Sequence, residues 1–185
     1  MSLRAKTCFF LAGAAIASAG PVLASDNPGA HQHGHAELQL AIEGEQIDLL
    51  FTSPAYNLVG FEHRARSDDQ KALVNDVTNW LGQTPLANTS EGGCTVMNAV
   101  VHHQAGGDDH GHSHGHDHPD ESSHSDFEVT QTLSCPGLSS SQALATPITT
   151  RFSGIEHLGV QWVRPQGQGS ARLGHGESRF ELRSR

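Results

Sequence analysis

Aromatic residues and positive charge are both scarce in this sequence. Phe, Trp and Tyr make up 5% of the 185 residues, and apolar residues of all kinds make up 36%. This composition supports a modest core surrounded by much loop, and the length suits a single domain. The chain carries 11 Lys and Arg against 20 Asp and Glu, a formal net charge of −9 with histidine neutral. Because such an acidic chain repels the phosphate backbone, we expect no nucleic-acid partner.

No long hydrophobic run occurs after residue 24. Before it, two positive residues precede an apolar and small-residue run over 9–20, and a small-residue motif ends at Ala24. The run is too short and too rich in Ala and Gly for a comfortable transmembrane helix, which favours a cleaved signal peptide over a retained N-terminal anchor. We therefore expect residues 1–24 to be removed, residues 25–185 to form one periplasmic domain, and no membrane span to remain.

Cysteine occurs three times, and Cys8 lies within the expected signal peptide. The other two, Cys94 and Cys135, are expected to form a disulfide in an oxidising compartment. By the chain-entropy estimate, a bridge that closes a loop of about 42 residues contributes roughly 4 kcal/mol. A thiolate metal site is the alternative, but the chain has no C-x-x-C spacing, and exported thiols rarely stay reduced.

Alternating apolar residues predict several strands. Leu38, Leu40 and Ile42 alternate with polar residues, and a Glu-Gly-Glu turn at 43–45 leads to a returning strand over 47–52. Further strands are expected over 94–101, 127–135 and 158–162, with one or two weaker strands after residue 170.

The segments 94–101 and 127–135 are expected to form the two arms of an antiparallel hairpin. A single register brings the cysteines and the apolar residues opposite one another, which makes the pairing self-consistent. The expected pairs are Cys94 with Cys135, Val96 with Leu133, Val100 with Val129, and His102 with Phe127.

The clearest helix signal begins at Ser67, where Gln70 completes a capping box. Apolar residues then recur on one helical face up to Leu81, and Gly82 is expected to end the helix. A second, short helix is expected over 146–152. The order of elements predicts an α+β fold: an antiparallel or mixed β-sheet with one main amphipathic helix and one short helix on one face, and a disordered His-rich insert at a hairpin tip.

Histidine is the outlier of the composition, with 14 residues, most of them in clusters. The richest cluster lies at the hairpin tip, at about 104–125, where Gly, Ser, Asp, Glu and Pro separate the histidines. With nothing apolar to bury, this tract cannot offset the entropy of ordering and is expected to be disordered. Its histidines are His110, His112, His114, His116 and His118, preceded by His102 and His103 and followed by His124.

Neutral imidazole is a good ligand for borderline divalent metals such as zinc. Several imidazoles of a disordered tract can converge on one ion, and neighbouring carboxylates help to offset its charge. The tract therefore predicts exchangeable metal capture. A solvated linker is the alternative, although such linkers are normally built from Ser, Gly, Glu and Lys.

A second cluster, His31, His33 and His35, directly precedes the first strand. In an extended backbone, residues two apart project to the same side, so these three imidazoles are expected to face one ion. Three nitrogen ligands with one open position are typical of an exchangeable or catalytic zinc site. The alternative is a disordered N-terminal tail.

Three histidines stand outside the clusters. His63 is interpreted either as a fourth ligand or as a hydrogen-bonded loop residue, and His157 and His175 as structural or surface residues. The sequence GFEH at 60–63 has a faint echo in GIEH at 154–157, which is too short to establish a duplication.

Four segments together carry a resemblance to a known family. They are HQHGHAEL at 31–38, SPAYNLVGFEH at 53–63, the His/Asp tract between two cysteine-flanked strands, and VQWV at 160–163. In these segments the chain resembles the ZrgA-type family of periplasmic zinc-binding proteins. The resemblance implies an accessory of zinc uptake that collects Zn²⁺ in the periplasm beside an ABC-type importer. It places the tract histidines in a variable insert and four histidines at motif positions, namely His31, His33, His35 and His63.

The working hypothesis is therefore a non-enzymatic protein that captures and relays Zn²⁺. A buffer or detoxification protein for Zn²⁺, Cu²⁺ or Ni²⁺ is the alternative, because Cu²⁺ is expected to bind such ligands at least as tightly as Zn²⁺. A zinc hydrolase is a third hypothesis, with Glu37 or Glu62 as its general base. It is weakened by the absence of both H-E-x-x-H and G-x-S-x-G from the sequence.

Overall fold

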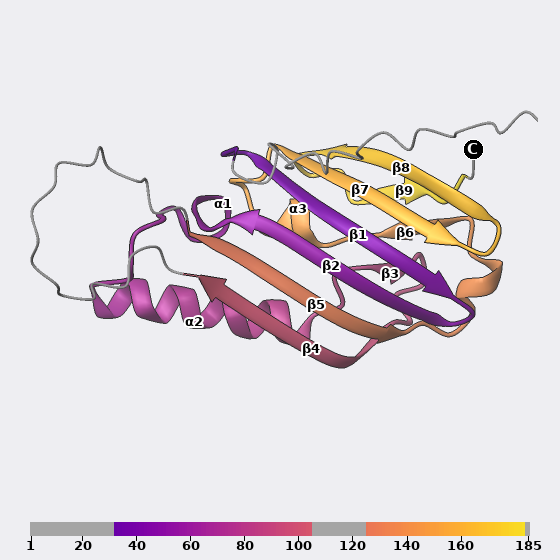
Figure 1. Cartoon of the computed structure of the whole chain (residues 1–185), viewed down its shortest axis with the longest axis horizontal. Coiled ribbons are helices and arrows are strands. Elements are labelled where there is room, and N and C mark those ends of the chain that lie inside the picture. The colour runs from indigo at the N-terminus through magenta and orange to yellow at the C-terminus, as the bar shows by residue number, and fades with distance from the viewer. Residues whose placement is uncertain (1–31, 105–124, 184–185) are drawn as a thin grey trace, which may run out of the picture.

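The computed structural model describes residues 32–104 and 125–183 of the chain. The expected signal peptide and almost all of the histidine tract lie outside these residues. The elements follow one another in the order β1 His35–Glu43, β2 Gln46–Pro54, α1 Ala55–Val59, α2 Asp68–Gln83, β3 Asn88–Thr89, β4 Thr95–Gln104, β5 Asp126–Ser134, a 3-10 turn Leu138–Ser140, β6 Ala143–Ala145, α3 Ile148–Arg151, β7 His157–Arg164, β8 Gly167–Gly174 and β9 Arg179–Glu181 (Figure 1).

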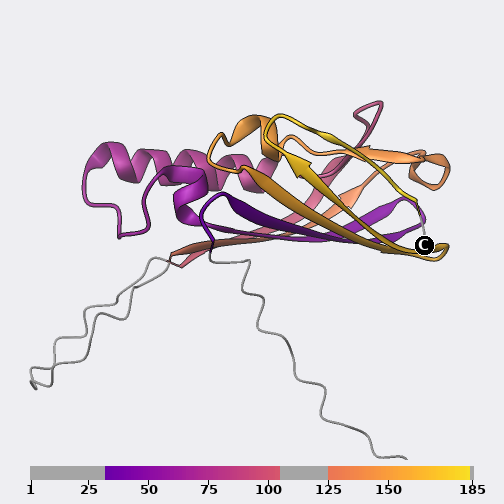
Figure 2. The same ribbon diagram turned by 90° about the horizontal axis from the view of Figure 1, so that it is seen from above.

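Six strands form one large sheet in the order β4-β5-β2-β1-β7-β8, while β3, β6 and β9 form a smaller sheet. Neighbours in the large sheet are antiparallel except β1 and β7, which run parallel. The helices and the small sheet lie together on one side of the large sheet (Figure 2). The expected α+β fold, with a mixed sheet and one main helix, is confirmed.

The alternation of side chains gives the large sheet one covered and one open face. On β1, Leu38 and Leu40 are buried, whereas Gln39 between them is exposed. On β2, Phe51 is buried and Asp48 is exposed. Because successive side chains of a strand point to opposite faces, the apolar set lies on the side that the helices cover. The opposite face is open and largely polar.

Helix α2 begins with the expected capping box. The Ser67 hydroxyl accepts the Gln70 N–H at 3.2 Å, and the Gln70 side chain accepts the Ser67 N–H in return. The helix continues one residue past Gly82, which we had expected to end it, and stops at Gln83. Among the described residues, no helix has the length and apolar content needed to cross a bilayer.

Cys94 and Cys135 form the expected disulfide at the base of the β4–β5 hairpin. Their Cα atoms lie 4.1 Å apart, and both residues are buried. Neither sulfur is therefore available as a thiolate ligand.

The expected register of this hairpin is correct at its base and wrong further along. Val96 lies opposite Leu133 as expected, but a β-bulge at Met97 then shifts the pairing by one residue. Met97 is the inserted residue, and its side chain is 69% exposed. A bulge leaves one residue of a strand without a partner, which the alternation of apolar residues does not reveal. Beyond the bulge, Val101 pairs with Val129 and His103 with Phe127, in place of the expected Val100–Val129 and His102–Phe127 pairs.

Helix α1 was not expected, because five residues are too few for a helical period to show in the sequence. It directly follows Pro54 and ends at Gly60, whose φ of +81° is in the left-handed region that glycine adopts without strain. The chain therefore turns sharply where we had expected a loop.

A buried amide joins α2 to the sheet. Gln131, 2% exposed, accepts a hydrogen bond from the N–H of Leu86 at 3.0 Å. Its Nε2 group donates to the carbonyl oxygens of Leu81 and Thr84 at 2.7 and 2.8 Å. One side chain thus satisfies three backbone groups where the helix ends and would otherwise leave carbonyls unpaired.

Replacing Gln131 by Leu is expected to lower the free energy of unfolding by about 3 kcal/mol, because three buried backbone groups lose their partner. The matched control is Gln161→Leu on the open face, where the change should stay within about 0.5 kcal/mol. Urea unfolding of both variants measures the difference. Equal stabilities of the two variants would contradict the role given to Gln131.

Candidate metal centre

The seven described histidines all lie at one end of the large sheet. Strands β1 and β7 begin at this end and β4 and β8 finish there, as their pairings require. The end is the one from which α1 and the start of α2 extend (Figure 1). Residues 104 and 125, which flank the histidine tract, close the β4–β5 hairpin at the same end. The seven are His33, His35, His63, His102, His103, His157 and His175.

The backbone before β1 turns where we had expected it to be extended. The His35 N–H donates to the Gln32 carbonyl at 3.0 Å, and Gly34 has a φ of +83°. The expectation that His33 and His35 project to one side from an extended strand is therefore wrong. Their rings have different neighbours. His31 lies outside the described residues.

Asn57 of α1 holds this turn in place. Its Oδ1 accepts the Gly34 N–H at 2.8 Å, and its Nδ2 group donates to the His35 carbonyl at 2.8 Å. Nδ2 also lies 3.2 Å from the Ser53 hydroxyl, and Asn57 is only 3% exposed. A single buried amide thus positions the backbone that carries two candidate ligands. In the sequence Asn57 stands within the motif over 53–63, and nothing in the motif indicated this role.

The His33 ring lies against α1 and the loop that follows it. It stacks on Tyr56, with ring centroids 4.3 Å apart and planes 16° apart. Its Nε2 is 2.9 Å from a carboxylate oxygen of Glu62. A carboxylate on one imidazole nitrogen fixes the orientation of the ring, as in the outer shell of many metal sites.

His63 is in the same loop and contacts Phe61 with ring centroids 5.0 Å apart. Its Nδ1 donates to the Arg64 carbonyl at 2.9 Å, because a carbonyl oxygen only accepts. Nε2 is then the ring nitrogen able to bind a metal ion. His63 directly follows Glu62, the residue whose carboxylate contacts His33.

His102 and His103 point to opposite faces of β4, since they are consecutive residues of a strand. His103 is half-buried, stacks on Phe127 with ring centroids 4.3 Å apart, and has Nε2 3.1 Å from the Ser125 hydroxyl. Burial lowers the pKa of the His103 imidazole below its ordinary value. His102 is exposed on the open face, opposite Glu128. The structure therefore separates these two candidates.

On the open face, His35 lies beside His157. The parallel register of β1 and β7 places the two residues opposite one another, with ring centroids 5.2 Å apart and planes 57° apart. We had interpreted His157 as a structural or surface residue. The short GIEH echo was the one sequence signal that linked it to the other histidines.

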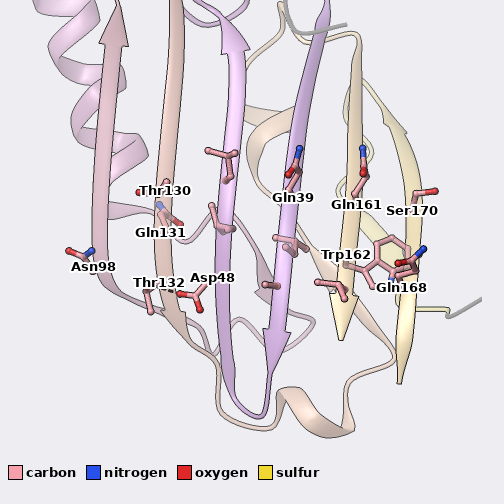
Figure 3. Close-up of a pocket in the computed structure, with 16 residues that line it drawn as sticks. Gln39, Asp48, Asn98, Thr130, Gln131, Thr132, Gln161, Trp162, Gln168 and Ser170 are labelled. Atoms are coloured by element: carbon pink, nitrogen blue, oxygen red, sulfur yellow. Dashed lines mark hydrogen bonds between the residues drawn. The ribbon is translucent and has the colours of Figure 1, made fainter. Parts of the chain in front are cut away.

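Two hollows mark the open face. One of about 890 Å³ lies over the middle of the sheet, where Gln39, Gln161 and Thr130 point into it (Figure 3). Among the described residues that line it there is no histidine, and Asp48 is the one carboxylate. A second hollow of about 650 Å³ reaches the histidine end, between His102 and Glu128. The residues that line this second hollow suit a cation better than the residues that line the first.

Within residues 32–104 and 125–183, no three His, Cys, Asp or Glu side chains stand close enough to hold a metal ion as they are arranged. Seven of the candidate ligands cannot be placed, because they lie outside these residues. They are His31, His110, His112, His114, His116, His118 and His124.

A sequence model of the ZrgA family of zinc uptake proteins matches residues 30–182. The chain belongs to this family. No protein of curated function gives a significant match. The ZrgA match includes every described strand and helix together with the histidine tract. The description of the ZrgA family gives zinc uptake as the role of its members.

In this ZrgA-family protein, replacing Asn57 by Ala is expected to lower the free energy of unfolding by about 2 kcal/mol, because buried hydrogen-bonding groups of the 32–35 turn lose their partner. Hydrogen exchange at the Gly34 amide should accelerate more than exchange in β2. Asn98→Ala, at an exposed site on β4, is the control. Unchanged protection at Gly34 would show that another contact holds the turn.

Because the pKa of His103 is lower in the folded state than its ordinary value of about 6.5, folding favours the neutral ring. This contribution to stability is complete above pH 6.5 and is lost as pH falls from there toward the folded-state pKa. In His103→Phe, which keeps an aromatic ring on Phe127 but cannot titrate, unfolding in the presence of chelator should lose less stability between pH 7 and pH 5. Parallel stability curves would contradict this assignment.

Proposed function

We propose that this protein captures Zn²⁺ in the periplasm and passes it to an importer of the ABC type. The observation that carries the proposal is the gathering of seven described histidines at the end of the sheet where the histidine tract is attached. Membership of a zinc uptake family supports zinc as the cargo. The tract collects the ion, and the histidines of the sheet end receive it.

The charge of this end suits a divalent cation. Glu37, Asp126 and Glu128 belong to β1 and β5 at the same end, and the whole chain is acidic. A negative field concentrates cations near the ligands and raises the rate of encounter. Imidazole ligands that are not locked in a closed tetrahedral site release the ion readily, which transfer requires.

A periplasmic location is supported by two features. The N-terminal 24 residues have the charge, apolar run and small-residue motif of a signal peptide. The Cys94–Cys135 disulfide is a bond that persists in oxidising compartments. Zinc capture outside the cytoplasm is the step that precedes import.

Zinc affinity is expected to fall by at least about tenfold between pH 7.5 and pH 5.5, because imidazole ligands must lose their protons and titrate near pH 6.5. Calorimetric titration of the metal-free protein with Zn²⁺ at the two pH values measures this change. Equal affinity at both would argue against histidine ligation.

Delivery is tested in cells that lack the chromosomal copy. Growth under zinc chelation should be restored by the intact chain and not by a chain whose tract histidines are replaced by Asn. Expression that rises on zinc starvation supports uptake. Expression that rises only on metal excess would favour buffering or detoxification instead.

A further inference from the structure

We propose that His35 and His157 together hold one Zn²⁺ on the open face of the large sheet, with Glu37 as a third ligand. The inference deepens the proposed function and rests on it, because it names the ordered site that receives the ion. Neither His157 nor Glu37 was expected to be a ligand from the sequence.

The spacing of the two rings fits a shared zinc ion. Their centroids are 5.2 Å apart and their planes are 57° apart. Two imidazoles that bind one tetrahedral Zn²⁺ at 2.0–2.1 Å have ring centroids about 5 Å apart. The two histidines therefore already have the separation that a common ion requires.

The backbone under this pair is held firmly. The carbonyl oxygen of Gly34 accepts both the Glu156 N–H at 2.8 Å and the His157 N–H at 2.9 Å. These two hydrogen bonds tie the start of β7 to the turn before His35. Asn57 holds the other side of that turn. Ligands on fixed backbone lose little entropy when the metal binds, so two histidines on adjacent strands make a better ordered site than two on a tail.

Glu37 is the carboxylate that completes the set. It lies on the same face of β1, two residues after His35, and it pairs in register with Gly159, two residues after His157. A Cβ atom at position 159 would lie only 2.5 Å from Glu37 Oε2. The missing side chain at Gly159 thus leaves the space through which the carboxylate of Glu37 extends toward β7.

Metal binding then requires one movement. The three side chains are not yet close enough together to hold an ion, so the Glu37 carboxylate has to swing along the strand toward the ring pair. Carboxylate oxygen and imidazole nitrogen are both zinc ligands, and a set of two histidines and one glutamate leaves the fourth position open. An open position allows the ion to enter from one donor and leave to another.

The test uses the full-length exported protein in which the six histidines of the tract, His110 to His124, are replaced by Asn. Competition with a chromogenic chelator at pH 7.5 measures binding of Zn²⁺ alone. This background protein should bind one Zn²⁺. Within it, H35N and H157N should each weaken binding by about 100-fold or more, since even partners outside the ligand set are worth about 10–100-fold. E37Q should weaken it about tenfold, and the control Q161N, at an exposed position further along β7 on the same face, should leave it within about twofold.

A second measurement needs no substitution at the site. Ring-nitrogen NMR of the background protein should show His35 and His157 shifting together as one equivalent of Zn²⁺ is added. Zinc binding in H157N as tight as in the background, or a shift at His35 without one at His157, would overturn this site and leave the proposed function standing. Absence of zinc binding by the unsubstituted protein would overturn both.

Discussion

The parallel pairing of β1 with β7 is the constraint on which the histidine end of the molecule depends. Leu38 and Leu40 on one strand and Leu158 and Val160 on the other are buried on the covered face, and their packing fixes the register. A parallel pair needs a long crossover, here most of the chain between residues 43 and 157. The start of β1 therefore meets the start of β7 only when the chain between them has folded back.

Local patterns in the sequence predicted the parts of the fold that depend on local physics. The period of two in β1 and β2 and the capping box of α2 are examples, and both are present. The turn before β1 was not predictable, because it exists through contacts with Asn57, which is more than twenty residues away along the chain. The arrangement expected for His33 and His35 was wrong for the same reason. Which imidazoles are neighbours depends on strand order, and no periodicity encodes strand order.

The described histidines form separate groups and not a single centre. His33 and His63 belong to the side of α1, with Glu62 between them in sequence and in contact with His33. His35 and His157 lie on the open face of the sheet. His103 faces the covered side. The described residues thus supply several partial sets of imidazole and carboxylate groups at this end of the sheet and no complete set.

The β-bulge at Met97 determines which of two consecutive histidines faces outward. With the inserted residue present, His102 is on the open face and His103 is stacked on Phe127. A substitution in a descendant gene that let residue 97 take a regular place in β4, opposite Thr132, would shift every later pair by one residue, and the following side chains would exchange sides. The half-buried imidazole would then become the solvent-facing one. Deletion of residue 97 would instead leave the later pairs as they are, so a substitution in an edge strand, and not a deletion, is a route by which evolution could exchange a packing residue for a ligand without altering any histidine codon.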